Sequence, residues 1–193
     1  MGVDRLRRID SSGKETELLS QLSESVDKCM SETRTISHLL HPPMIDELGF
    51  PAAANWYVRG FSERSGIKVS FESGNGSRRL PRSVELPLFR ILQGSLSNVH
   101  RHAESLSIDV HFAVSETEAK LEVKDYGKGI DPELLREFAR TGGGAGIGLA
   151  GMRERLRELG GRLEVESDEH GTLIRALIPV STSSAAKKSG AGK

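Results

Sequence analysis

The chain has 193 residues, with 27 Lys and Arg against 27 Asp and Glu and a single cysteine. A formal net charge of zero gives no electrostatic reason to expect sequence-independent nucleic-acid binding, and one cysteine forms neither an internal disulfide nor a zinc cluster. No signal peptide opens the sequence and no apolar run is long enough to cross a membrane, so we expect a soluble, cytoplasmic protein. The unusual number is 21 glycines, and their positions need explaining.

The N-terminal region has the pattern of a helix that associates with another helix. After residues 1–13, expected to be flexible, the segment from Lys14 to Leu40 contains neither Gly nor Pro. Its apolar residues are separated by alternating steps of three and four, with Thr33 in one slot: Leu19, Leu22, Val26, Cys29, Ile36 and Leu40. This heptad pattern predicts a coiled-coil-like dimerisation helix, although packing on the chain's own globular domain is an alternative. Pro42 and Pro43 end the helix.

The rest of the chain alternates helices and hairpins. Apolar spacing, proline starts and glycine ends predict helices over residues 51–65, 81–103 and 132–140, and a last helix after Gly146 that ends at Gly160. Alternation predicts strands at residues 67–71, 106–112, 121–123, 162–167 and 172–180, followed by a disordered tail, 181–193. This order indicates an α+β, two-layer sandwich whose mostly antiparallel sheet is covered on one face.

Two glycines follow the strand that ends at Asp125. In Asp125-Tyr126-Gly127-Lys128-Gly129-Ile130, the glycines let the backbone turn sharply and approach a flat ligand. The Asp125 carboxylate could then accept a hydrogen bond from an exocyclic amine such as that of adenine. Asp-x-Gly also forms ordinary turns, so this motif alone is weak.

A second glycine cluster, residues 142–148, precedes a helix. Free backbone N–H groups and the helix dipole there would form an anion site. A flexible linker is the alternative, and the sequence does not match the common phosphate-binding loops.

A third element lies on the preceding helix, where Asn98 and His102 are four residues apart and therefore neighbours. The Asn98 amide oxygen could ligate Mg²⁺, and the His102 imidazole or Arg101 could meet phosphates. Taken alone, His100 and His102 are better explained as part of an ordinary polar surface.

The three elements together resemble the N, G1 and G2 boxes of the GHKL ATPase superfamily of histidine kinases, gyrase, Hsp90 and MutL. Asn98 precedes Asp125 by 27 residues, and Gly146 follows Asp125 by 21. The runs 98–103 and 146–155 closely resemble one branch of bacterial two-component sensor histidine kinases, and 34–50 resembles that branch's second dimerisation helix and its exit. The resemblance covers residues 14–180.

The resemblance implies a Bergerat-type ATP-binding fold, with a dimerisation-type helix over 14–48 and an ATP-binding catalytic domain over 49–180. It implies that Asn98 coordinates Mg²⁺, Asp125 holds the adenine amine and Thr172 places a hydroxyl near the base. The implied ATP-binding residues are Asn98, His102, Asp125, Gly127, Gly129, Ile130, Gly144, Gly146, Ile147, Gly148, Leu149 and Thr172. Implied partners are a response regulator receiver domain and a second copy of the chain through helix 14–40. The net charge and the absence of a long apolar run lead us to expect no nucleic-acid partner and no membrane segment.

Two departures from the family pattern limit the functional prediction. Gly94 stands where the branch usually has a glutamate that activates phosphoryl transfer, so we expect nucleotide binding to persist and chemistry to slow by about 10²–10⁴-fold. In this family the phosphoacceptor histidine lies on a first dimerisation helix, and we expect that helix and any sensor domain to be absent from this sequence. His38 and His41 have the wrong neighbours and are interpreted as incidental.

The sequence is compatible with three functions. The first is the ATP-binding catalytic part of a cytoplasmic histidine kinase, either as a piece of a longer kinase or acting on a histidine in trans. The second is a nucleotide-binding module with weak or no kinase activity, suggested by Gly94 and the missing acceptor. The third is a serine kinase of the anti-sigma type, against which the heptad helix and the Leu40-His41-Pro42-Pro43 exit argue.

Overall fold

The structure is a computed structural model that describes residues 43–74, 79–141 and 147–180. The chain separates into two compact units, residues 1–43 and 44–193. The predicted heptad helix and the C-terminal tail lie outside the described residues. Within the described ranges, no helix has the length and apolarity to span a bilayer.

The second unit is built on a five-stranded sheet in the order β1-β2-β3-β5-β4. Its strands are β1 Lys68–Ser73, β2 Ser107–Val114, β3 Glu118–Asp125, β4 Arg162–Asp168 and β5 Gly171–Pro179. Strand β1 pairs parallel with β2, and the other three pairs are antiparallel. The predicted, mostly antiparallel sheet is confirmed.

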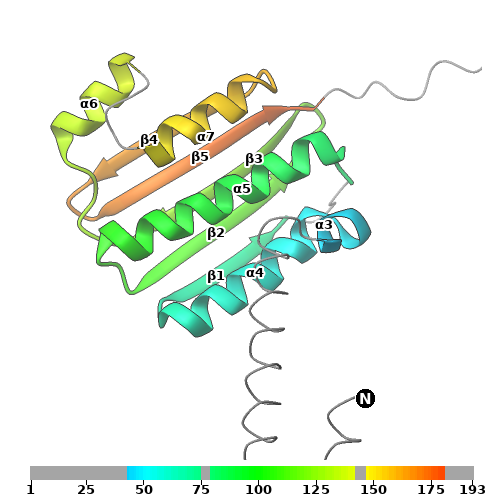
Figure 1. Ribbon diagram of the computed structural model, residues 1–193, viewed down its shortest axis with the longest axis horizontal. Coiled ribbons are helices and arrows are strands. Elements are labelled where there is room, and N and C mark those ends of the chain that lie inside the picture. Colours follow the sequence, from blue (N-terminus) through cyan, green and yellow to red (C-terminus); the bar gives the residue numbers. More distant parts are fainter. Residues whose placement is uncertain (1–42, 75–78, 142–146, 181–193) are drawn as a thin grey trace, which may run out of the picture. The chain divides into compact units, whose positions relative to one another are not determined.

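The helices of the described part are α3 Pro43–Leu48, α4 Phe50–Ser65, α5 Arg82–Asn98, α6 Pro132–Thr141 and α7 Ile147–Arg157. Helices α4, α5 and α7 lie across one face of the sheet, and α6 lies beside the end of β4 (Figure 1). This arrangement confirms the two-layer α+β fold. The apolar face of α5 packs on the sheet through the fully buried Leu88, Phe89, Leu92 and Leu96.

The predicted helix over 81–103 differs from the structure near its end. The α-helix stops at Asn98 and continues as a single π-helical turn, Val99–Ala103. Glu104 then adopts a left-handed backbone with φ 56°, which ends the turn and redirects the chain toward β2. A π turn inside a helix is rare and is frequent at functional sites.

Leu106 corrects the sequence-based assignment of β2. Alternation placed it on the buried face with Ile108, but Leu106 lies before the strand and is 82 % exposed. Alternation predicts which face a side chain takes and carries no information about where the covering helices end.

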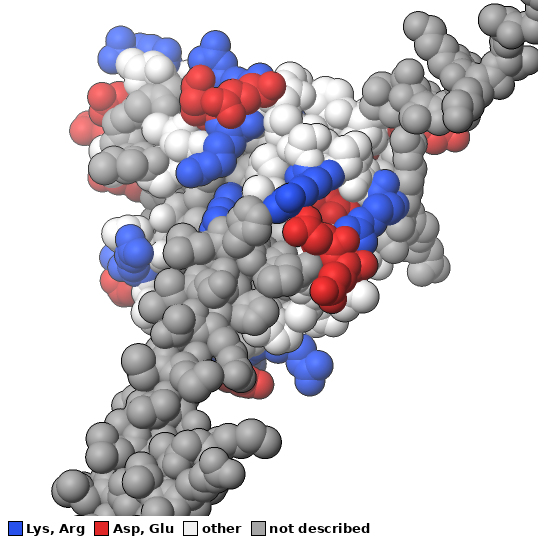
Figure 2. Space-filling view, turned by 45° about the vertical axis from the view of Figure 1, so that its right-hand side comes forward, with Lys and Arg blue, Asp and Glu red and all other residues white. Residues whose placement is uncertain are grey.

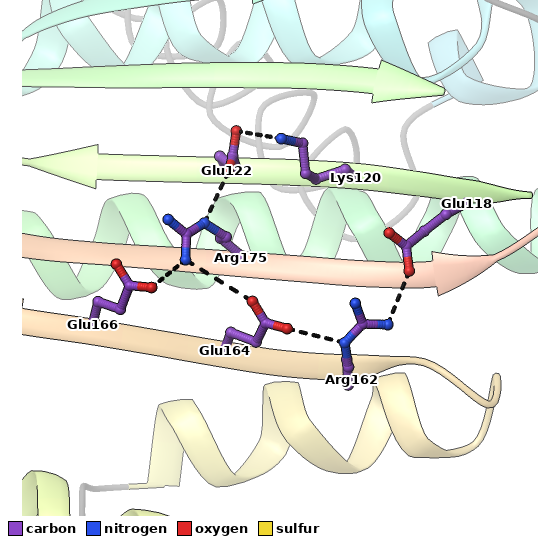
Figure 3. Close-up of polar contacts among 7 residues, drawn as sticks. All are labelled: Glu118, Lys120, Glu122, Arg162, Glu164, Glu166 and Arg175. Carbon is purple, nitrogen blue, oxygen red and sulfur yellow. Dashed lines mark hydrogen bonds and ion pairs between the residues drawn. The ribbon is translucent and has the colours of Figure 1, made fainter. Parts of the chain in front are cut away.

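The face of the sheet opposite the helices is charged. Along β3, Leu121 and Val123 are buried, whereas Lys120 and Glu122 project from the other face. Arg175 on β5 donates to Glu122 at 2.9 Å and pairs with Glu164 and Glu166 on β4 (Figure 3). The side of the molecule seen in Figure 2, turned by 45° from the view of Figure 1, also carries charges of both signs next to one another. Asp125 alternates in phase with the buried Leu121 and Val123 along β3, so its side chain lies on the side of the helices, away from this charged network.

Candidate functional site

The predicted motifs meet at one end of the sheet. Strand β3 ends at Asp125, and its antiparallel neighbour β5 begins at Gly171, close to where β4 ends. The C-terminus of α5 and the N-terminus of α7 lie at this same end (Figure 1). Antiparallel pairing therefore brings together residues that are far apart in the sequence.

Asp125 is a buried carboxylate at the end of β3, with 4 % of its surface exposed. It accepts a hydrogen bond from the backbone N–H of Gly127 at 2.9 Å, and the nearby backbone N–H and hydroxyl of Thr172 also act to lower its pKa. Burial nevertheless raises the pKa of Asp125, because desolvation outweighs these donors. A buried carboxylate in this position favours a ligand that brings a hydrogen-bond donor.

The glycines after Asp125 are required by the protein's own backbone. A Cβ at Gly127 would lie 2.0 Å from the carbonyl oxygen of Ala103, at the end of the π turn. A Cβ at Gly129, where φ is +73°, would lie 2.0 Å from the carbonyl oxygen of Asp168. The chain thus needs glycine at both positions before any ligand is considered, and their role toward a base stays a prediction.

Thr172 and Ser167 complete the polar end of the sheet. Thr172 is 5 % exposed, and its Oγ1 lies 2.9 Å from the Oγ of Ser167, its cross-strand neighbour. The Ser167 Oγ also accepts from the backbone N–H of Ile130 at 2.8 Å. Sequence reasoning missed Ser167, although its place opposite Thr172 in the β4–β5 hairpin is a signal that could have found it.

Asn98 and α7 are in direct proximity. A Cβ at Gly148, in the first turn of α7, would lie 3.2 Å from the Oδ1 of Asn98. The half-buried Asn98 therefore faces the helix N-terminus that was predicted to bind an anion. His102 lies on the π turn and is exposed.

The remaining predicted residues are distributed as follows. Gly144 and Gly146 lie outside the described residues, and Ile147 begins α7. Leu149 is 4 % exposed, so its side chain packs inside the unit. Ile130 joins the site through its backbone N–H.

The side chains at this site could hold Mg²⁺ only together with oxygen atoms supplied by a ligand. Within the described ranges, no group of three His, Cys, Asp or Glu side chains could hold a metal ion. A single amide oxygen, that of Asn98, fits the way Mg²⁺ is held with substrate phosphates and water, because that ion rarely uses an all-protein cage.

Gly94 faces α7. A Cβ at this position would lie 2.6 Å from the terminal methyl of Met152, which is 2 % exposed. The Met152 thioether thus fills the space into which a side chain at position 94 would project. The neighbouring Ser95 hydroxyl, also buried, lies 3.9 Å from the Met152 sulfur.

Known proteins match this chain over most of its length. Residues 83–182 match the family described as histidine kinase-, DNA gyrase B-, and HSP90-like ATPase. The signal transduction histidine-protein kinase/phosphatase DegS of Brevibacillus brevis is 33 % identical over 175 residues, which is 90 % of this chain and 43 % of DegS. The sensor histidine kinase MctS of Rhizobium johnstonii is 31 % identical over 158 residues, 82 % of this chain and 33 % of MctS. The chain spans less than half the length of these relatives.

Solved structures share the fold. The histidine kinase domain of the Erythrobacter litoralis EL346 blue-light activated histidine kinase has a TM-score of 0.59 at 18 % identity, covering 92 % of this chain and 90 % of that one. The catalytic domain of the histidine kinase ThkA has a TM-score of 0.56 at 20 % identity, covering 67 % and 89 %.

Proposed function

Because the chain belongs to the histidine kinase-, DNA gyrase B-, and HSP90-like ATPase family, we propose that its second unit is the ATP-binding catalytic part of a sensor histidine kinase. In this proposal it transfers the γ-phosphoryl group of ATP to a histidine. The observation that carries it is the buried Asp125 carboxylate at the end of β3, the end of the sheet where α5 finishes at Asn98 and α7 begins (Figure 1).

Each group has a distinct role in this proposal. Asp125 accepts from the adenine amine, with Thr172 beside it, and the loop of Gly127, Gly129 and Ile130 borders the base. Gly144, Gly146, Ile147 and Gly148 offer backbone N–H groups to the phosphates; Asn98 holds Mg²⁺ and His102 meets a phosphate oxygen. Mg²⁺ neutralises charge on the phosphates, and the protein supplies mainly position, which is what phosphoryl transfer requires.

The binding part of the proposal is tested by calorimetric titration of the full chain with Mg²⁺ and a non-hydrolysable ATP analogue. Asp125→Asn replaces an acceptor oxygen by a donor opposite the base, so we expect the affinity to fall at least about tenfold. Asp109→Asn is the matched control, because Asp109 is also hydrogen-bonded, to Ser70 and Tyr126, but on the opposite face of the sheet. Absence of binding by the unsubstituted chain, or an equal loss in both variants, would overturn the proposal.

We propose the same domain plan as the sequence predicts. Residues 14–48 form a dimerisation helix, 49–180 bind ATP, and 1–13 and 181–193 flank them. A response regulator receiver domain is the proposed downstream partner, in the cytoplasm. The names of the longer relatives support this assignment, since they are histidine kinases.

A nucleotide-binding module with little kinase activity is a second candidate, and the Gly94–Met152 contact favours it. No carboxylate stands at position 94, and the Met152 methyl fills its place. The test supplies an acceptor helix from a related kinase in trans and compares the unsubstituted chain with Gly94→Glu and its matched control Gly94→Gln.

Phosphotransfer raised by Gly94→Glu but not by Gly94→Gln supports the module with impaired chemistry. Glutamate restores a general base, and glutamine only displaces the Met152 methyl. Robust transfer by the unsubstituted chain refutes this second candidate. Acid treatment of the labelled product identifies the acceptor, because phosphohistidine is acid-labile and phosphoserine, the product of an anti-sigma-type kinase, is not.

A further inference from the structure

Ser167 joins three backbone segments at the end of the sheet. Its Oγ accepts from the N–H of Ile130 at 2.8 Å and lies 3.1 Å from the carbonyl oxygen of Gly171. It also lies 2.9 Å from the Thr172 hydroxyl, where either oxygen can be the donor. Ser167 is therefore one step removed from Asp125, since Thr172 stands between them.

The protons of the Ser167 and Thr172 hydroxyls can be placed in two ways that give each proton an acceptor. Each hydroxyl carries one proton and can accept two hydrogen bonds. In the first arrangement, Ser167 donates to Thr172 and Thr172 donates to Asp125. In the second, Thr172 donates to Ser167 and Ser167 donates to the carbonyl of Gly171. No buried hydroxyl proton lacks an acceptor in either case.

The two arrangements differ at Asp125. In the first, the proton of the nearby Thr172 hydroxyl is directed at the carboxylate, which also accepts from the N–H of Gly127. In the second, the hydroxyl proton is directed at Ser167 instead, so one more acceptor site of the carboxylate is open to an incoming donor.

Building on the proposed ATP-binding function, we propose that Ser167 is a positioning residue for base recognition: its Oγ accepts the Thr172 proton when the amine of a base binds to Asp125. Without this oxygen, the Thr172 proton has only Asp125 as an acceptor and competes with the amine. A hydrogen-bond donor left without a partner in a buried site is costly. Removing the Ser167 oxygen should therefore lower the affinity for a base that carries the amine.

The experiment measures the preference of the full chain for Mg-ATP over Mg-ITP, because inosine carries a carbonyl where adenine carries the amine. The triphosphate and ribose are the same in both, so the ratio of the two affinities reports recognition of the N1–C6 edge of the base, the edge that is proposed to face Asp125 and Thr172. We compare Ser167→Ala with Ser167→Thr, which keeps the hydroxyl, and repeat Ser167→Ala in a Thr172→Val background.

We expect Ser167→Ala to reduce the ATP preference about tenfold when Thr172 is present, and Ser167→Thr to keep it. In the Thr172→Val background there is no hydroxyl proton to accept, so Ser167→Ala should change the ratio less than about twofold. A role limited to holding the Ile130 backbone would lower the ratio equally in both backgrounds, and that result would overturn the proposal.

Two further outcomes are decisive. If the unsubstituted chain binds neither nucleotide, both the proposed function and the role of Ser167 are wrong. If it prefers ATP and Ser167→Ala keeps that preference, only the role of Ser167 is wrong. Should Ser167→Ala not fold, Ser167→Cys offers a weaker acceptor of similar size, and an unchanged ratio in that variant contradicts the proposal.

Discussion

Asp125 illustrates how single residues shape this site. Its carboxylate is buried at the end of β3, and burial raises its pKa above the ordinary value of 3.8, although the N–H of Gly127 and the nearby Thr172 act to lower it. For an acid whose pKa is raised on folding, the ionised form is disfavoured in the folded state. The stability of the fold therefore decreases as the pH rises through the pKa of Asp125. A group that weakens the fold when ionised is easier to understand as part of a binding site than as a structural element.

The raised pKa predicts a pH dependence of base recognition. Only the ionised Asp125 can accept from the amine at all of its sites, so the preference for Mg-ATP over Mg-ITP should decrease as the pH falls. Because the pKa is raised, the decrease should begin at a higher pH than for an exposed aspartate. Calorimetric titrations from about pH 7 down to about pH 4 test this, since the ratio cancels the titration of the phosphates. A ratio that does not change over this range contradicts it.

Gly127 gives a second prediction at the same scale. In Gly127→Ala the new methyl would lie 2.0 Å from the Ala103 carbonyl oxygen, so the backbone must shift at a cost of about 1–3 kcal/mol or more. Gly151→Ala is the matched control, because Gly151 lies within α7 with only the end of Arg155 within reach, at 3.4 Å. Chemical unfolding should show a large loss for the first variant and none for the second. Equal unfolding midpoints would show that the loop yields easily.

At the scale of elements, α6 is attached to the unit by few contacts. Phe138 is its one buried residue among those described. Arg153 on α7 stacks over the Phe138 ring, with its guanidinium carbon 5.3 Å from the ring centroid, and donates to the Phe138 carbonyl at 3.0 Å. For a helix with so little buried surface, the free energy of local opening is far smaller than the free energy of global unfolding.

This contact predicts a local effect of one substitution. Arg153→Gln removes both the stacked cation and the charged hydrogen bond, so amide hydrogen exchange in α6 should accelerate at least about tenfold while exchange in β3 is unchanged. Arg157→Gln is the control, because Arg157 is exposed on the same helix. Uniform acceleration in α6 and β3 would instead indicate a global loss of stability.

At the scale of the whole molecule, the boundary between the two units falls after Pro43, the first residue of α3, so the rest of that helix belongs to the second unit. Ile45 on α3 is 2 % exposed, and the Arg79 guanidinium donates to the carbonyls of Ile45 and Asp46 at 2.5 and 2.6 Å. Helix α3 therefore packs as part of the second unit.

The predicted consequence is that residues 44–193 fold and bind Mg-ATP as a monomer, whereas the full chain is a dimer through the heptad helix. A shorter piece, 50–193, loses Ile45 and the α3 carbonyls and should unfold at least about 2 kcal/mol more easily. Analytical ultracentrifugation and chemical unfolding measure the two properties separately. A monomeric full chain would refute the role of the helix, and equal stability of the two pieces would refute the role of α3.

Much of the fold could be predicted from local patterns. The order of helices and strands follows from periodicity, and the strand before Asp125 and the helix after Gly146 were predicted because their apolar spacing is local information. Leu106 and the π turn were missed because both depend on tertiary contacts. The extent of the helix layer determines the exposure of Leu106, and the left-handed Glu104 terminates the π turn.

The sequence by itself determined the elements, the mostly antiparallel sheet and the residue types that could meet a nucleotide. Only the tertiary structure decided that Asn98 faces Gly148, that Met152 fills the space above Gly94 and that Ser167 stands behind Thr172. The physical reason is that side-chain periodicity encodes the face of an element. Which ends meet depends on strand order and register, and these arise from packing between residues distant in the chain.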